Sequence, residues 1–243
     1  TRIDAIMIER LLPSGKIEAG YYAAGYRLLD AVNAIGFLFA SLLLPMFAQI
    51  HAQKKSLTPL LRLSLNHIIA LAGWISMILI TYSTPIIQAL YPSMPPSVPI
   101  ILIYLMLTFI CLAVGYVFGT LLTATGNIYK MNGLFALAAL INIGLNWYWI
   151  PSEKAIGAAK ATLLTQIFVC LALILMANHW LKLKFIFRNW LKPLLYLGFL
   201  IFLGWSLTYL QISMFTGIII SSLVALGISL TIGLIQPFKW LKN

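Results

Sequence analysis

Long apolar runs, separated by short polar connections, form the dominant pattern along the chain. Each run is at least as long as the roughly 20 apolar residues that a helix needs to cross a bilayer. The connections contain proline, glycine and charged residues, which are typical of turns, as at 91–97 and 151–157. The runs predicted to span the membrane are 21–50, 60–90, 98–124, 131–150, 156–178, 189–210 and 214–236.

A shorter apolar piece at 3–12 precedes these runs and is too short to cross a bilayer alone. We expect it to be the outgoing half of a helix, and because Thr1 already stands inside the helical pattern, we expect further spans before it. An outer-membrane barrel would alternate apolar and polar residues, which these runs do not. The predicted fold class is therefore all-α, a polytopic transmembrane helical bundle.

Composition supports a membrane protein and excludes a water-soluble globule. Of the 243 residues, 62% are hydrophobic and 9% are charged, and the mean hydropathy is +0.98. A typical soluble domain has about 25% charged residues. Cys111 and Cys170 lie inside apolar runs without metal-ligand spacing, so we expect neither a disulfide framework nor a metal site. We also expect no catalytic residues and no cofactor.

The net charge of +11 predicts orientation in the membrane, not nucleic-acid binding, because the basic residues form no continuous patch. Cytoplasmic connections are enriched in Lys and Arg. One set of alternate connections carries Lys54, Lys55, Arg62, Lys130, Lys182, Lys184, Arg188, Lys192, Lys239 and Lys242. The opposite set carries Arg10, Lys16 and Lys154. This alternation predicts a multi-pass membrane protein with a cytoplasmic C-terminus.

Two stretches go beyond composition. Residues 20–50 run glycine, tyrosine, small residues, Tyr-Arg-Leu, an apolar run and Leu-Pro; residues 122–162 run a small-Gly turn, a helix with two asparagines, Ile-Pro, Gly-Ala-Ala and Ala-Thr. Together with the RIDAIMI start, they resemble the C-terminal half of Wzx-like polysaccharide flippases, in the multidrug/oligosaccharidyl-lipid/polysaccharide exporter superfamily. The recognisable order covers about residues 1–180.

The resemblance implies a transporter of two helical lobes and a terminal helix pair. Residues 1–180 would be the second lobe, with a truncated first helix, and residues 181–243 the terminal pair. The implied function is flipping of polyprenyl-diphosphate-linked oligosaccharide by alternating access, for cell-surface polysaccharides such as O-antigen, without covalent chemistry. The implied partners are that substrate, membrane lipids and the missing N-terminal lobe. The terminal pair would border a groove for the polyprenyl tail, as the resemblance to related lipid II flippases implies.

Arg27 and Asp30 are the sharpest candidates for substrate binding, because an ionised side chain inside a bilayer is costly. A guanidinium can hold phosphate oxygens bidentately, and Arg27 occupies the position of the intramembrane arginine in the YxxxYR-like pattern of the family that the chain resembles. Counted from Tyr21, both residues lie in the first turns of their helix, near the outer rim. Alternatively, at i and i+3 they neutralise each other without touching substrate.

Four further residues are candidate substrate contacts. Arg2 and Asp4, in the first helix, extend the charged cluster; alternatively Asp4 is the counter-ion of Arg27. Asp4 or Asp30 can also take part in cation or proton coupling. Asn142 and Asn146 are one turn apart on one helix face, so both can bind sugar hydroxyls or make interhelical hydrogen bonds.

Three other classes of protein are open alternatives. A multidrug cation exporter of the same superfamily should have an acidic or aromatic cavity, and it is disfavoured because the chain has only five acidic residues and mixed intramembrane charges. A membrane-embedded polysaccharide polymerase, ligase or glycosyltransferase would need paired acids and histidines or a large outer loop. A membrane subunit without a transport path is the remaining alternative.

Overall fold

The computed structural model describes residues 2–181 and 188–234, and all regular structure in these residues is α-helical. The predicted all-α class is confirmed. The helices are α1 (Arg2–Leu11), α2 (Gly15–Ala52), α3 (Thr58–Thr81), α4 (Ser83–Leu90), α5 (Ser97–Ala124), α6 (Ile128–Leu181), α7 (Arg188–Tyr209) and α8 (Met214–Thr231).

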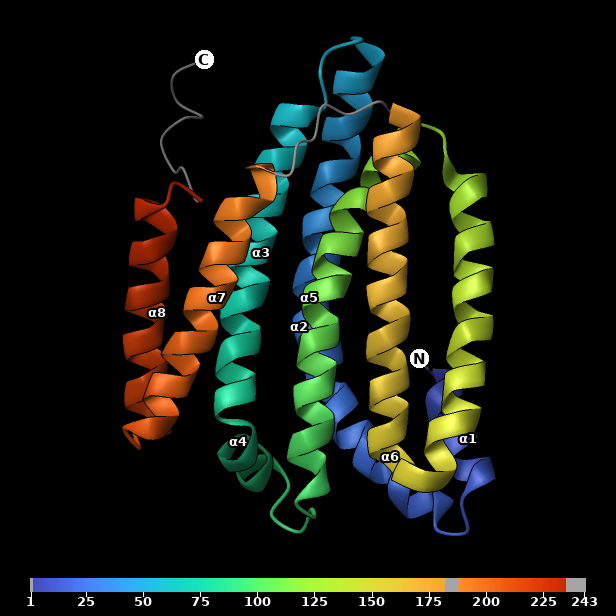
Figure 1. The fold of residues 1–243 in the computed structure, drawn as a ribbon, viewed down its shortest axis with the longest axis vertical. Helices are drawn as coiled ribbons and strands as arrows, with labels where there is room; N and C mark the ends of the chain where they lie inside the picture. The colour runs from blue at the N-terminus through green and yellow to red at the C-terminus, as the bar shows by residue number, and fades with distance from the viewer. Residues whose placement is uncertain (1, 182–187, 235–243) are drawn as a thin grey trace.

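Six of these helices, α2, α3, α5, α6, α7 and α8, are long and apolar enough to cross a membrane, so the chain is a multi-pass membrane protein. Helix α6 bends back on itself next to Pro151, where Lys154 has φ 54° and ψ −133° (Figure 1). Its two arms, residues 128–153 and 155–181, match the two separate runs that the sequence predicts on either side of the turn at 151–157.

Three predicted boundaries are wrong. The run at 60–90 is two helices, because Pro85 has no N–H to donate to the Thr81 carbonyl and the helix breaks at Tyr82. Helix α8 ends at Thr231, before the predicted 236, because Gly233 adopts φ 68° and closes the helix end. The part of that run beyond 234 lies outside the described residues. Helix α2 begins at Gly15, six residues before Tyr21.

Helix α5 lies at the centre of the bundle and packs against α2, α3 and α6 (Figure 1). Apolar side chains cover every face of α5, as expected for a helix that is surrounded by others. Helix α1 packs on α2 and α6, while α7 and α8 pack on α3 at the opposite edge of the bundle. The fully buried side chains of α5 include Ile101, Leu102, Leu105, Met106, Val117, Phe118 and Leu121.

Helix α8 meets its neighbours through a buried stripe of small residues at every fourth position: Gly217, Ser221, Ala225 and Ser229. Small side chains allow helix backbones to approach closely in a membrane. Gly217 faces the ring of Tyr82, whose hydroxyl donates to the Ile212 carbonyl at 3.3 Å.

Replacing Gly217 with leucine should loosen α8, because even a Cβ at this position would collide with the Tyr82 side chain. Overpacking of this kind costs about 1–3 kcal/mol. Thermal unfolding in detergent should show a lower midpoint for Gly217→Leu. Gly227→Leu is the matched control, since Gly227 is exposed on the same helix with nothing near its Cβ position; equal midpoints for both variants would contradict this packing.

Candidate functional site

The carboxylate of Asp4 is fully buried and receives hydrogen bonds from three helical segments. The hydroxyls of Tyr22 on α2 and Thr162 on the second arm of α6 donate to Oδ2 at 3.0 and 3.2 Å. Asn146, on the first arm of α6, donates from Nδ2 to Oδ1 at 2.8 Å. Hydrogen bonds of this kind offset the cost of moving an ionised carboxylate out of water. Asp4 therefore ties α1 to α2 and to both arms of α6.

The hydrogen bonds continue along the contact between the two arms of α6. Asn146 also lies 3.1 Å from Asn142 Oδ1, and Asn142 Nδ2 lies 3.5 Å from Thr165 Oγ1. Asn142 and Asn146 are both buried, and the structure brings them together with Asp4, consistent with their predicted position on one helix face. We call this set the Asp4 cluster: Asp4, Tyr22, Asn142, Asn146, Thr162 and Thr165.

The Asp4 cluster offers oxygen atoms of the kind that hard cations prefer. Asn146 Oδ1 is buried and has no hydrogen-bond partner in the described part of the chain. Among the residues the structure describes, no group of three or more His, Cys, Asp or Glu side chains lies close enough to hold a metal ion. A single carboxylate among amides and hydroxyls suits a proton or a monovalent cation better than a divalent ion.

Arg27 and Asp30 are exposed on α2 and form no hydrogen bond with the Asp4 cluster in the described part of the chain. Between the described residues, no ion pair joins Arg27 to Asp30 or to Asp4. Among the described residues, neither the Arg27–Asp30 pair nor the Asp4–Arg27 pair that the sequence allows is therefore formed. The side chain of Arg2 lies outside the described residues, so its predicted role stays a prediction.

The exposed face of α2 that carries Arg27 combines charge with small side chains. Ala31, Ala34 and Leu38 follow Arg27 at helical spacing and are also exposed. Because α2 begins at Gly15, Arg27 lies twelve residues, or about 18 Å, along the helix axis. Arg27 is thus further from the start of its helix than predicted, because the prediction counted from Tyr21.

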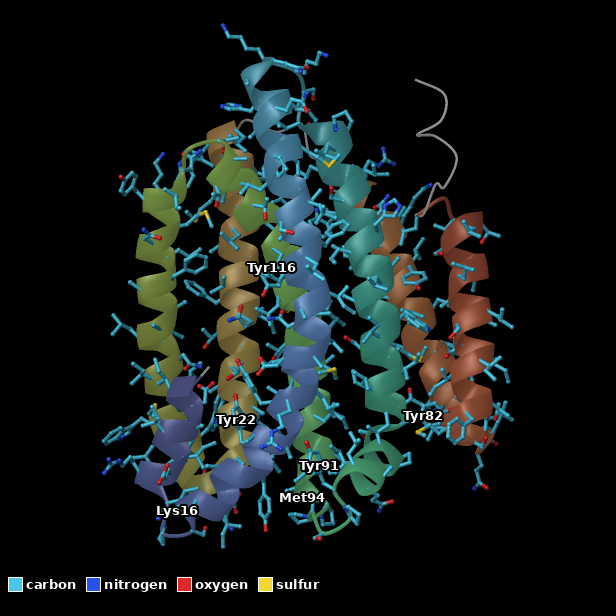
Figure 2. All side chains as sticks on the ribbon, turned by 180° about the vertical axis from the view of Figure 1, so that it is seen from behind. Lys16, Tyr22, Tyr82, Tyr91, Met94 and Tyr116 are labelled. Carbon is cyan, nitrogen blue, oxygen red and sulfur yellow. The ribbon has the colours of Figure 1, made fainter. Side chains whose placement is uncertain are left out.

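Two ion pairs hold the turn of α6 at the end of the bundle where Lys16 lies (Figure 2). Lys154, whose backbone is in a region that non-glycine residues rarely adopt, pairs with the buried Glu18 of α2 at 3.2 Å. Lys160 pairs with Glu153 across the turn and lies 5.7 Å from the ring of Tyr104 on α5. These contacts fix the turn against α2 and α5.

A second feature is an apolar groove of about 520 Å³ between α3, α5 and α7. Leucine and isoleucine side chains form half of its lining, and Gly73 on α3 and Gly204 on α7 allow the two helices to pack closely beside it. The family resemblance implies a groove for a polyprenyl tail beside the terminal helices, at about 189–236. The observed groove borders α7 and has no lining residue on α8, and its use by a polyprenyl tail stays a prediction.

Three members of the Asp4 cluster, Tyr22, Thr162 and Thr165, were not predicted from the sequence. A signal was present, because Tyr22 lies in the Gly-Tyr-Tyr segment and Thr162 in the Ala-Thr segment of the two stretches that carry the family resemblance. Hydroxyl residues are common in membrane helices, however, and position alone does not show which of them reaches the carboxylate of Asp4, which is 18 residues from Tyr22 and 158 residues from Thr162.

The fold is similar to that of a helical membrane transporter of known structure. The solved structure described as "Lipid II flippase MurJ, inward closed conformation" superposes with a TM-score of 0.69 over 89% of this chain, at 20% sequence identity. The match covers 46% of that chain, so this chain spans about half its length. No protein-family model and no curated protein sequence matches the chain. The likeness thus shows the fold and leaves function to be argued from the site.

Replacing Asn146 with alanine should destabilise the fold, because it removes a hydrogen bond to a buried carboxylate. Such a bond contributes about 1.5–3 kcal/mol. Thermal unfolding of the detergent-solubilised protein should report the loss, while Asn132→Ala, at an exposed position on the same arm, should leave the midpoint unchanged. If Asn146→Ala has the same unfolding midpoint as the wild type, the Asp4 cluster does not hold the helices together.

Proposed function

We propose that the chain is the second lobe (residues 1–180) and terminal helix pair (181–243) of a flippase that carries polyprenyl-diphosphate-linked oligosaccharide across the bacterial inner membrane by alternating access. The fold is similar to that of a lipid II flippase. The observation that carries the proposal is Arg27, which is exposed on a membrane-spanning helix and forms no ion pair with any residue that the structure describes. In this proposal the protein performs no covalent chemistry.

A charged face on a membrane helix needs a polar surrounding. An Arg or Asp at the centre of a bilayer costs about 2.5–3.5 kcal/mol, so such residues almost always face a cavity or another helix. Arg27 and Asp30 have no partner of opposite charge in the described part of the chain, and the alanines beside them leave room for a ligand. We therefore place this face of α2 on the central cavity, opposite the N-terminal lobe that the proposal requires.

A diphosphate is the ligand chemistry that Arg27 fits best. Its planar guanidinium can donate two parallel hydrogen bonds to phosphate oxygens and compensate their charge in a medium of low dielectric constant. The prenyl tail needs an apolar path beside this site. The groove between α3, α5 and α7 supplies apolar walls at the edge of the bundle next to the terminal helices.

The Asp4 cluster is separate from Arg27 and supports a second role, coupling to a proton or a monovalent cation. Its carboxylate binds groups from α2 and both arms of α6, so a change in its charge acts on the packing of α1 and these segments at once. In this proposal Asn142 and Asn146 contribute to ion coupling through their hydrogen bonds in the Asp4 cluster. Arg27 and Asp30 bind the substrate. Alternating access needs such a link between ion binding and lobe conformation.

The substrate role of Arg27 can be tested by complementation in a bacterium that lacks its own sugar-lipid flippase. The full-length protein should restore surface polysaccharide, and Arg27→Ala should lower it at least tenfold at equal membrane abundance. Arg27→Lys should restore part of the activity, because a charge without bidentate geometry still attracts phosphate. Arg10→Ala is the matched control, because Arg10 is exposed in the last turn of α1.

Two results would contradict the proposal. If Arg27→Ala supports normal surface polysaccharide, Arg27 has no part in substrate binding. If the wild-type protein restores no polysaccharide and instead confers resistance to cationic dyes, the protein is a drug exporter of the same fold.

The coupling role of Asp4 predicts that Asp4→Asn abolishes the response to an ion gradient. In proteoliposomes with the full-length protein, an imposed sodium or pH gradient should accelerate flipping by the wild type and not by Asp4→Asn, since the amide neither binds a proton nor carries charge. Glu9→Gln, an exposed neighbour on α1, should behave as the wild type. Gradient stimulation that survives in Asp4→Asn would remove the Asp4 cluster from coupling.

A further inference from the structure

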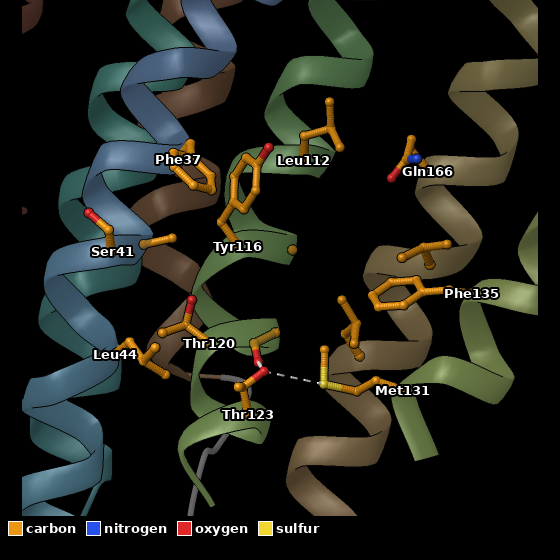
Figure 3. Close-up of a pocket in the computed structure, with 15 residues that line it drawn as sticks. Phe37, Ser41, Leu44, Leu112, Tyr116, Thr120, Thr123, Met131, Phe135 and Gln166 are labelled. Atoms are coloured by element: carbon orange, nitrogen blue, oxygen red, sulfur yellow. Dashed lines mark hydrogen bonds between the residues drawn. The ribbon is translucent and has the colours of Figure 1, made fainter. Parts of the chain in front are cut away.

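A pocket of about 430 Å³ lies between α2, α5 and both arms of α6 (Figure 3). Clefts that bind small ligands measure about 300–1,000 Å³. The pocket is on the part of α2 that follows Arg27, toward the end of the bundle that carries Lys54. None of the candidate residues chosen from the sequence lines it. Its walls include three aromatic rings, those of Phe37, Tyr116 and Phe135.

Three polar side chains line this pocket without a hydrogen bond to any described residue: Tyr116, Thr120 and Gln166. Figure 3 shows the Gln166 amide extending from the second arm of α6 toward the space enclosed by α2 and α5. Tyr116 projects into the same space from α5, beside Phe37. By contrast, the other hydroxyls on the walls, Ser41 and Thr123, donate to carbonyls of their own helices.

The polar side chains that have no hydrogen bond to a described residue make a hydrocarbon chain an unfavourable occupant of this pocket. An amide that loses water without gaining a partner costs about 1–3 kcal/mol, so a prenyl or acyl chain next to Gln166 would be unfavourable. A saccharide can contact both the polar side chains and the aromatic rings that line the pocket. Its hydroxyls can pair with the amide, the phenol and the threonine, and the apolar C–H faces of its rings can lie against the aromatic side chains.

The pocket also lies at a suitable distance from Arg27. Phe37 follows Arg27 by ten residues, which is about 15 Å along α2. The first sugar of a diphosphate-linked oligosaccharide is bonded directly to phosphate, so a distance of this size falls on later sugars of the same chain. Ser41, which also lines the pocket, is on the same exposed face of α2 as Arg27.

We infer that this pocket is a saccharide subsite, in which Gln166 and Tyr116 bind sugars beyond the diphosphate. The inference rests on the proposed flippase function. It adds a site by which the protein distinguishes lipid-linked substrates that differ in their sugars. It assigns Arg27 to the diphosphate and Gln166 with Tyr116 to the sugar, so the two sites make separate contributions to affinity.

The experiment measures equilibrium binding of two probes to the full-length protein in lipid nanodiscs. One probe is undecaprenyl diphosphate, and the other is undecaprenyl diphosphate bearing an N-acetylglucosamine trisaccharide. Gln166→Leu should weaken binding of the glycosylated probe about fivefold to tenfold, the effect of one hydrogen bond, and leave binding of the bare probe unchanged. Arg27→Ala should weaken both probes equally.

Two controls separate a lost sugar contact from a damaged fold. Gln88→Leu makes the same change at an exposed position on α4, outside the pocket, and should bind both probes as the wild type does. Tyr116→Phe removes only the hydroxyl and keeps the ring, so it should reproduce a smaller loss for the glycosylated probe alone. Thermal midpoints of all variants are measured on the same samples.

The outcomes distinguish the subsite from the proposed function. If the wild type binds both probes equally, or if Gln166→Leu and Tyr116→Phe leave the glycosylated probe unaffected, the pocket is not a saccharide subsite, while the flippase proposal stands on the effect of Arg27→Ala. Equal weakening of both probes by Gln166→Leu would also overturn the subsite. If the wild type binds neither probe, the proposed function fails and the subsite with it.

Discussion

A buried carboxylate in a membrane helix must find hydrogen-bond donors inside the protein, because neither lipid nor the apolar core supplies them. Asp4 meets this constraint with a phenol, an amide and a hydroxyl from three different segments. The donors come from positions 18, 142 and 158 residues away in the sequence. Satisfying this one group therefore decides how α1, α2 and both arms of α6 are arranged relative to one another.

The reversal of α6 follows from the same constraint. The turn contains Lys154 in a backbone conformation that costs of order 1–3 kcal/mol for a residue with a Cβ. Gly157 makes room for it, because a Cβ there would collide with the backbone of Trp149. The strained turn persists because contacts hold both arms, with the Asp4 cluster inside the bundle and the Lys154–Glu18 pair at its end.

How far the sequence predicts this structure depends on the range of the interaction. Apolar runs locate the crossing segments, because transfer of each run into lipid depends on local composition. The break at Tyr82 is also local, and Pro85 could have revealed it. The pairing of Asp4 with Asn146 could not be predicted in this way, since many polar residues of other helices are chemically able to reach a carboxylate. The pocket beside Gln166 is harder still, because residues from three helices define it only after packing.

The two polar sites on α6 are connected by covalent geometry. Thr165 belongs to the Asp4 cluster and bonds across to Asn142, whereas the next residue, Gln166, lines the pocket. The pocket is also lined by Met131 and Phe135, on the same arm as Asn142. A change in the separation of the two arms therefore alters the Asp4 cluster and the pocket together. Coupling between sites requires a shared element that both can bias, and the α6 hairpin is such an element, with each site bridging the same two arms at a different depth.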